Sequence, residues 1–180
     1  SQNCYYCGLR RDNRLIKRYH LERNEIINLA MQAHNDGYQS ICLQSGQVTS
    51  SHEVDFVADV IATIKKSSES KGQGLGVTLS LGELSYQQYQ QLWDAGAHRY
   101  LLRIETSNPA LFKKIHPPEQ SCNRRLECLQ ALTEIGYQVG TGVMIGLPGQ
   151  SYEDLAKDLQ FFQEKDIDML GMGPYIPHPD

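Results

Sequence analysis

The sequence lacks a long apolar run and lacks an excess of positive charge. No stretch approaches the roughly 18 consecutive apolar residues that a helix needs to cross a bilayer. Seventeen basic and 21 acidic side chains leave a formal net charge of −4, whereas proteins that bind nucleic acids or membrane surfaces carry basic patches. We therefore expect neither a nucleic acid nor a membrane as the main partner, and the first residues do not resemble a signal peptide.

Cysteine is also scarce. The chain has five cysteines at irregular spacing, namely Cys4, Cys7, Cys42, Cys122 and Cys128. The disulfide framework of a secreted protein is dense and usually holds an even number of cysteines. We therefore expect a reducing, cytoplasmic environment.

No linker rich in Gly, Ser and Pro divides the chain, which instead alternates between helix and strand patterns. Apolar residues at helical spacing predict helices over 22–37, 53–66, 85–96, 109–115, 122–136 and 151–166. Short buried patterns predict strands over 40–44, 74–82, 98–105, 137–149 (with a turn at its end) and 168–176. Ser85 is a predicted helix N-cap, and Ser151 with Asp154 resembles a capping box.

Strict alternation predicts a parallel sheet with crossover helices, in either a doubly wound sheet or a (β/α) barrel. No GxGxxG follows the first strand, so a dinucleotide-binding Rossmann fold has no support. Five strands cannot close a normal eight-stranded barrel. The fold class we predict is therefore α/β, a partial TIM-type barrel that forms one domain over 1–180, with further strands before Ser1 and after Asp180.

Polar side chains fall on one face of the buried strands. Side chains alternate faces along a strand, so Thr78 and Ser80 oppose the apolar positions of their strand, and Arg103 and Glu105 oppose Leu102 and Ile104. In a barrel this polar face lines the lumen near the carboxyl-end rim, where barrel enzymes do their chemistry. Alternatively, Arg103 and Glu105 form a structural ion pair with other buried charges, because a buried charge needs a partner.

Two rim loops extend this set of candidates. The segment "MIGLPGQ" is rich in Gly and Pro, which lets the backbone approach a ligand closely. The segment "PYIPHPD" carries His178 and Asp180. The other five histidines show no metal-ligand spacing, and we assign them to the surface or the core: His20, His34, His52, His98 and His116.

Cys4 and Cys7 form a CxxC pair that admits several interpretations. A thioredoxin-like redox motif would need a preceding strand, and a zinc ribbon would need a second CxxC. An iron–sulfur cluster held by three thiolates would need one more cysteine. In a CxxxCxxC motif, that cysteine falls immediately before Ser1.

The segment "CYYCGLRRDN" resembles the cluster loop of radical S-adenosylmethionine (SAM) enzymes. The segments "LQSGQ", "VTLSLGE", "RYLLRIETSNP", "GLPGQSYEDL" and "GPYIPHPD" follow in the order and near the spacing of the HydE family, the radical SAM maturases of FeFe hydrogenase. The resemblance implies a barrel that carries a 4Fe–4S cluster at its mouth. It also implies reductive cleavage of SAM to a 5′-deoxyadenosyl radical.

Residue by residue, the resemblance makes Cys4 and Cys7 cluster ligands and catalytic residues. It places Tyr6, Ser45, Gly46, Glu105, Arg125 and Gly146 at SAM, with Arg125 pairing with Glu105 and Arg124 as an alternative. It places Thr78, Ser80 and Arg103 at the substrate. Ile104 departs from the His that is frequent in the family. Cys42, Cys122 and Cys128 match no ligand position, and we expect Cys42 to be a small core residue.

The implied partners are a small iron-containing or amino-acid-like substrate, other hydrogenase maturases, and an electron donor such as ferredoxin or flavodoxin. Two alternatives stay open. One is a radical SAM enzyme like biotin synthase or methylornithine synthase, which acts on a small amino acid or vitamin precursor. The other is a non-catalytic module whose CxxC binds zinc or forms a regulatory disulfide.

Overall fold

The computed structural model describes residues 2–70 and 72–178; Asp180 lies outside this range. A five-stranded parallel sheet runs in the order β1-β2-β3-β4-β5. Its strands are β1 Ser40–Gln44, β2 Gly76–Ser80, β3 Arg99–Leu101, β4 Gln138–Ile145 and β5 Met169–Pro174. The spatial order equals the chain order, whereas a doubly wound sheet reverses at a switch point. This topology confirms the partial barrel.

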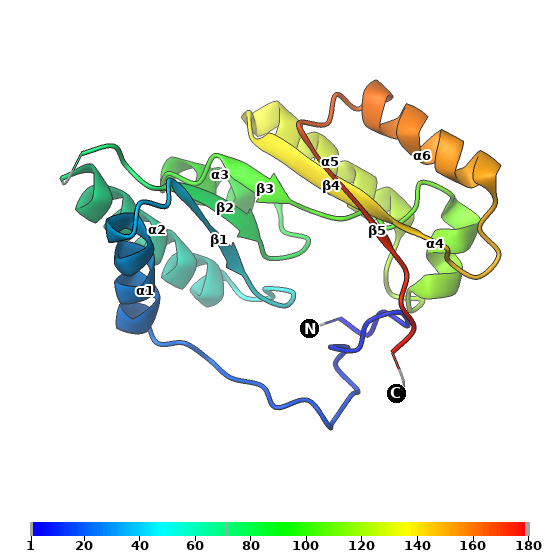
Figure 1. The fold of residues 1–180 in the computed structure, drawn as a ribbon, viewed down its shortest axis with the longest axis horizontal. Helices are drawn as coiled ribbons and strands as arrows, with labels where there is room; N and C mark the ends of the chain where they lie inside the picture. Colours follow the sequence, from blue (N-terminus) through cyan, green and yellow to red (C-terminus); the bar gives the residue numbers. More distant parts are fainter. Residues whose placement is uncertain (1, 71, 179–180) are drawn as a thin grey trace.

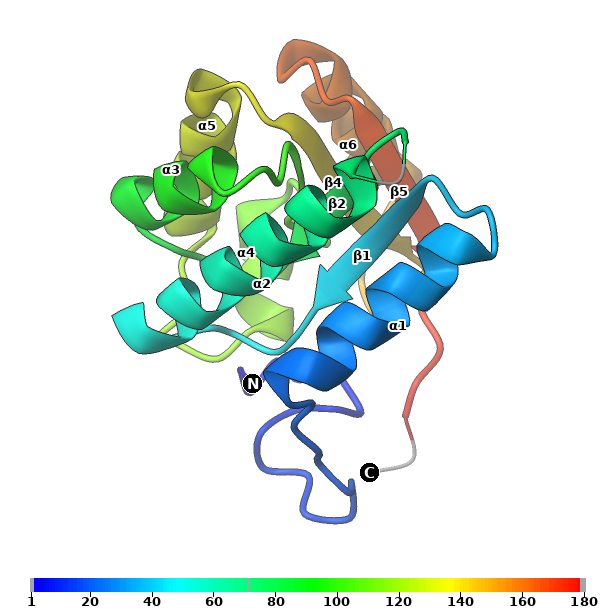
Figure 2. The same cartoon turned by 90° about the vertical axis from the view of Figure 1, so that its left-hand side faces the viewer.

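Helices connect the strands and lie along one face of the curved sheet (Figures 1 and 2). They are α1 Arg23–Asn35, α2 Ser51–Glu69, α3 Tyr86–Asp94, α4 Pro109–Ile115, α5 Cys122–Ile135 and α6 Tyr152–Glu164. In sequence, α1 packs on α2, α2 on α3, and α3 on α5. A doubly wound fold would place helices on both faces. None of these helices is long and apolar enough to span a membrane.

The helix ends follow from local sequence. The Ser85 side chain accepts the Gln88 N–H at the start of α3, and Ser151 with Asp154 forms a reciprocal capping box at the start of α6. Gly136 ends α5 with φ of +105°, a left-handed conformation that only glycine adopts at little cost. Both predicted N-caps are therefore confirmed.

The strand predicted over 98–105 is shorter in the structure, because β3 ends at Leu101. The side chain of Thr141 on β4 takes the Ile104 N–H at 3.0 Å. Glu105 has φ of +66°, which breaks the extended conformation before the chain meets β4 again at an isolated bridge to Val143. A side-chain hydrogen bond from the neighbouring strand thus interrupts the backbone ladder, which continues at Leu102 and Glu105.

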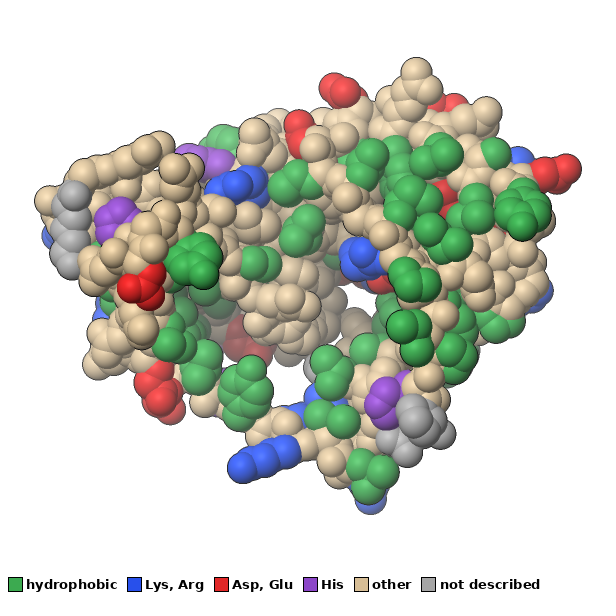
Figure 3. Space-filling view, viewed as in Figure 1, with side chains coloured by type: hydrophobic (Ala, Val, Ile, Leu, Met, Phe, Trp, Pro, Cys, Tyr) green, Lys and Arg blue, Asp and Glu red, His purple; other side chains and the backbone are tan. Residues whose placement is uncertain are grey.

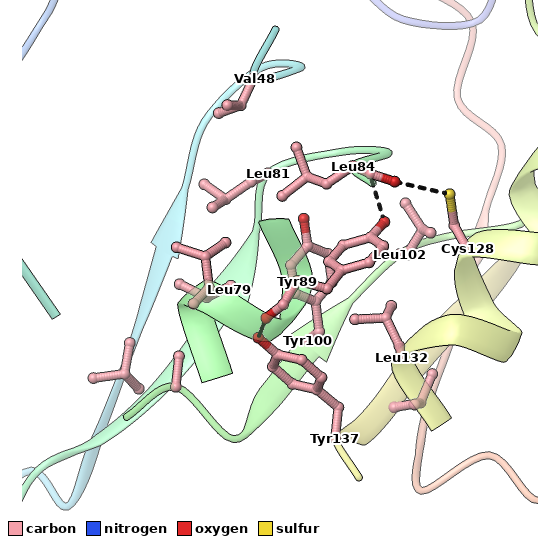
Figure 4. Close-up of a cluster of buried hydrophobic side chains, with 14 of the residues drawn as sticks. Val48, Leu79, Leu81, Leu84, Tyr89, Tyr100, Leu102, Cys128, Leu132 and Tyr137 are labelled. Carbon is pink, nitrogen blue, oxygen red and sulfur yellow. Dashed lines mark hydrogen bonds between the residues drawn. The ribbon is translucent and has the colours of Figure 1, made fainter. Parts of the chain in front are cut away.

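The apolar core lies between the sheet and the helices. Figure 4 shows part of it, where Tyr89 of α3 contacts Tyr100 of β3 edge to face, with ring centroids 5.1 Å apart. Cys128 of α5 is buried there, and its thiol donates to the Leu84 carbonyl at 3.7 Å. Burying these side chains is the main stabilising term of the fold. The core leaves the opposite face of the sheet free for polar groups.

Cys42 corrects one prediction. It is exposed and pairs in register with Thr78, so it lies on the polar face of β1 instead of in the core. The helix-facing positions of β1 are its two apolar neighbours, Ile41 and Leu43. The alternation of a single edge strand therefore decides the environment of this cysteine.

Candidate functional site

The cysteine loop lies at the carboxyl end of the sheet, against the end of α4. Tyr5 donates its backbone N–H to the Ile115 carbonyl at 2.9 Å, although the two residues are far apart in sequence. Cys7 donates its backbone N–H to the Cys4 carbonyl at 3.1 Å, so the two cysteines occupy the ends of one tight turn. Both are half-buried. The loop thus presents two thiols from one turn at the rim where the sequence predicts chemistry.

The far end of the chain meets the same loop. The His178 ring occupies the space that a side chain at Gly8 would fill. Both chain ends lie on the same side of the molecule (Figure 1). The structure therefore brings the candidate His178 to the cysteine loop, and the close approach explains a glycine at position 8.

Gln120, in the link between α4 and α5, contacts Cys4. Its side-chain Nε2 lies 3.3 Å from Cys4 Sγ, and its Oε1 lies 3.6 Å from the same sulfur. Burial raises the pKa of the Cys4 thiol, while the contact with Gln120 and the Arg125 charge work in the opposite direction. The sequence analysis missed Gln120, because its contact joins residues 116 positions apart.

Tyr6 links the loop to the barrel interior. Its hydroxyl donates to Glu105 Oε1 at 3.4 Å, and its ring stands edge-on to His116 at 5.4 Å. His116 stacks on Phe112 at 3.8 Å, and its Nδ1–H donates to the Phe112 carbonyl at 2.9 Å. Burial lowers the pKa of His116 to about 4, so the ring is neutral at physiological pH. Of the two environments expected for this histidine, surface or core, the structure shows the core.

Glu105 and Arg103 form an ion pair on the polar face of the sheet. The Arg103 Nε–H donates to both carboxylate oxygens, at 3.0 and 3.1 Å. Nη2 donates to the Val143 carbonyl at 3.1 Å, and Nη1 lies 3.4 Å from the Gly171 carbonyl. A side chain on Gly171 would stand 3.0 Å from Nη1, so glycine leaves room for the guanidinium. The predicted faces of Arg103 and Glu105 are confirmed, as is an ion-pairing role for both.

Arg125 has a different partner from the predicted one. Its Nε–H donates to Glu83 Oε1 at 2.6 Å, and Nη1 donates to the Arg103 carbonyl. The carboxylate of Glu105 is instead taken by Arg103 and Tyr6. The predicted pair of Arg125 with Glu105 is therefore wrong in this structure, because a nearer carboxylate occupies the guanidinium.

Arg124, the alternative to Arg125, has different partners. It donates to the Leu84 carbonyl at 2.7 Å and meets Glu127 at 3.4 Å, with 46% of its side chain exposed. The Arg125 side chain is only 11% exposed. Burial and position therefore favour Arg125 as the basic residue of the site.

Gln47 holds the loop that carries Glu83. Its Nε2 donates to the Glu83 carbonyl at 2.6 Å, and its Oε1 accepts the Glu83 N–H at 2.9 Å. These two bonds fix the backbone of Glu83, whose carboxylate then reaches Arg125. Glu83 and Gln47 are site residues that the sequence analysis missed. Each lies just beyond a strand end, next to a glycine, and closes a segment that carries the resemblance, "LQSGQ" or "VTLSLGE", but neither was given a role.

Three further predicted segments line the same rim. Ser45 and Gly46 are exposed just past β1, and the Ser45 N–H donates to the Ser80 carbonyl at 3.1 Å. Thr78 and Ser80 project from the polar face of β2, beside Cys42 and Gln44. The backbone N–H of Gly146 donates to Gln150 Oε1 at 2.7 Å, which shapes the "IGLPGQ" turn.

Figure 3 shows an opening between the sheet and the N-terminal loop, with basic and acidic side chains beside it. The polar face of the strands, the cysteine loop and the ion pairs thus meet at one end of the barrel. Among residues 2–70 and 72–178, no three His, Cys, Asp or Glu side chains stand close enough to hold a metal ion.

Comparisons with known proteins agree with this geometry. The chain is 49% identical over 179 residues to the [FeFe] hydrogenase maturase subunit HydE of Thermotoga maritima, across 99% of this chain and 49% of that protein. It is 29% identical over 171 residues to biotin synthase of Staphylococcus aureus, across 94% of this chain and 49% of that protein. The chain spans about half the length of these relatives.

Solved structures share the fold. Methylornithine synthase superposes with a TM-score of 0.85 at 23% identity, over 99% of this chain and 51% of that structure. The hydrogenase maturase HydG superposes with a TM-score of 0.80 at 23% identity, over 100% of this chain and 42% of that structure. The family model for the radical SAM superfamily matches residues 1–162. Since that match takes in the cysteine loop and most of the barrel segment, the chain belongs to the radical SAM superfamily.

Proposed function

We propose that the protein is a radical SAM enzyme of FeFe-hydrogenase maturation, with the activity of a HydE maturase. The observation that carries the proposal is the 49% identity to the Thermotoga maritima maturase along almost the whole chain. Biotin synthase, at 29% identity over a similar length, is much less similar. Synthesis of a vitamin or amino acid precursor is therefore the second candidate.

The cysteine loop fits a 4Fe–4S cluster. Thiolates are the usual ligands of such clusters, and Cys4 and Cys7 come from one turn that is anchored to α4. They would bind two of the irons, and we predict that a cysteine immediately before Ser1 binds the third. Such a cluster would supply the electron for the reductive cleavage of SAM. The partly buried loop limits the access of water.

The surrounding residues fit SAM. Glu105, held by Arg103 and Tyr6, offers carboxylate oxygens to hydroxyl or ammonium groups. Arg125 offers a guanidinium that is suited to the SAM carboxylate. Ser45, Gly46 and the Gly146 turn leave polar backbone groups open at the rim. Tyr6, which lies between the two cysteines of the loop, offers an aromatic ring.

The proposed substrate position is the polar face of the sheet, beside the residues that we propose bind SAM. Thr78 and Ser80 offer hydroxyl groups, and Arg103 offers a guanidinium that is 43% exposed. These groups suit a small, polar, iron-containing or amino-acid-like substrate. The remaining proposed partners are the other hydrogenase maturases and an electron donor such as ferredoxin or flavodoxin, in the cytoplasm.

The full-length protein, reconstituted anaerobically with iron and sulfide and reduced with dithionite, tests the enzyme assignment. We expect it to convert SAM to methionine and 5′-deoxyadenosine, measured by chromatography. An intact, cluster-loaded protein that leaves SAM unchanged would contradict both enzyme candidates. Maturation is tested separately, because extract that lacks this protein should fail to activate apo-hydrogenase until the protein is added back. Activation without it would favour the second candidate.

Glu105→Gln tests the SAM residues. The substitution keeps the shape of the side chain and removes its charge, so we expect SAM to bind about 10- to 100-fold more weakly. Iron content should be unchanged, because Glu105 contacts neither cysteine directly. Equilibrium dialysis of SAM and iron analysis give the two quantities. Glu127→Gln is the control, since among the described residues Glu127 forms an ion pair only with the exposed Arg124. Iron loss in Glu105→Gln would show that this carboxylate is misassigned.

A further inference from the structure

Cys4 is fixed from two sides by the segment between α4 and α5. On one side, Tyr5 bonds to the Ile115 carbonyl at the end of α4. On the other side, the Gln120 amide reaches Cys4 Sγ. The backbone N–H of Gln120 donates to the Pro117 carbonyl at 3.0 Å, which closes a turn just before the N-cap of α5, Ser121. Gln120 therefore extends from a constrained turn.

The chemistry of the sulfur decides which contact with Gln120 persists in a cluster ligand. In the thiol form, Cys4 can donate to Oε1 at 3.6 Å or accept from Nε2 at 3.3 Å. A thiolate bound to iron has no proton to give and is acceptor-only. Of the two contacts, only the one in which Gln120 Nε2–H donates to the negatively charged Cys4 sulfur can then form.

On the basis of the function proposed above, we propose that Gln120 donates an N–H hydrogen bond to the Cys4 thiolate and raises the reduction potential of the cluster. Reduction adds a negative charge that is shared with the ligand sulfurs. A hydrogen bond to such a sulfur therefore stabilises the reduced form more than the oxidised form. Gln120 is a positioning residue, since it acts on the cluster through Cys4 and does not meet the reacting atoms.

Arg125 contributes charge to the same sulfur, so the two effects must be separated. The Arg125 charge acts on Cys4 through space, but its hydrogen bonds go to Glu83 and to the Arg103 carbonyl. Its charge is unaltered by substitution of Gln120. A change of potential in a Gln120 variant that adds no charge therefore reports the amide.

Gln120→Met in the full-length, anaerobically reconstituted protein tests the proposal. Methionine has a similar length and no N–H donor. We expect a more negative midpoint potential of the cluster in an EPR-monitored redox titration without SAM. We also expect loss of an exchangeable proton coupling in electron–nuclear double resonance after transfer to D2O. Gln130→Met is the matched control, because Gln130 is exposed on α5 and bonds only to Glu134 at 3.0 Å among the described residues; its potential should equal the wild-type value.

Gln120→Glu provides a second variant of nearly equal shape. It replaces the N–H donor by a carboxylate, so the potential should again move to a more negative value. Equal midpoint potentials in the wild type and Gln120→Met overturn the proposal, because the Gln120→Glu carboxylate can shift the potential by its charge alone. Loss of iron from both variants also overturns it, since Gln120 then holds the loop instead of tuning the cluster. Absence of a 4Fe–4S signal from the wild-type protein itself would instead contradict the proposed function.

Discussion

Replacing Cys7 by alanine is expected to abolish both cluster assembly and SAM cleavage in the full-length protein. In the proposed ligation three thiolates would hold the cluster, and the loss of one would leave it only two protein ligands. A backbone hydrogen bond closes the tight turn between Cys4 and Cys7, and alanine at position 7 can still make this bond. The expected loss of the cluster therefore comes from the missing thiolate ligand and not from misfolding of the loop. Iron and sulfide per chain, the visible absorption of the cluster, and 5′-deoxyadenosine are the quantities to measure.

Cys42→Ala is the matched control for this prediction. Cys42 is exposed on the polar face of β1 and matches no ligand position, so iron content and SAM cleavage should stay at wild-type values. The comparison also tests the non-catalytic alternative. If wild-type protein takes up zinc in preference to an iron–sulfur cluster, and Cys7→Ala loses only zinc, the CxxC is a structural metal site and the enzyme assignment fails.

Local pattern was enough to predict the architecture. Helix and strand periodicity placed six helices and five strands in their observed order, because each amphipathic pattern depends on residues a few positions apart. The two predicted caps depend equally on neighbours, as with Ser151 and Asp154. The polar faces of β2 and of the segment after β3 followed from simple alternation.

The errors in the length of β3 and in the partner of Arg125 have a different physical origin, which is contact between segments far apart in the sequence. β3 ends early because Thr141 takes a backbone N–H that a longer strand would have used. Arg125 pairs with Glu83, 42 residues away, while Arg103 takes the carboxylate that the resemblance assigned to Arg125. Charge complementarity alone indicates that a buried arginine needs an acid. It does not indicate which acid lies nearest.

Glu83→Ala is expected to be the most destabilising of the substitutions at the ion pairs. The Arg125 and Glu83 side chains are only 11% and 16% exposed, so removing the acid leaves a largely buried guanidinium without its carboxylate. Breaking a buried pair in this way costs about 3–5 kcal/mol of unfolding free energy. Urea unfolding of the full-length protein gives the value. Glu127→Ala removes the partner of the exposed Arg124 and should cost less than about 1 kcal/mol.

The double variant Glu83→Leu with Arg125→Met separates the structural role of this pair from its role at the ligand. Replacing a buried pair by apolar residues of similar volume is often neutral, so much of the stability lost in Glu83→Ala should return. SAM binding should not return, because the guanidinium that would receive its carboxylate is gone. Recovery of both stability and SAM affinity would mean that Arg125 serves only the fold. Recovery of stability alone would mean that Glu83 holds the Arg125 guanidinium in place for SAM. The pair would then serve ligand binding and not the stability of the fold.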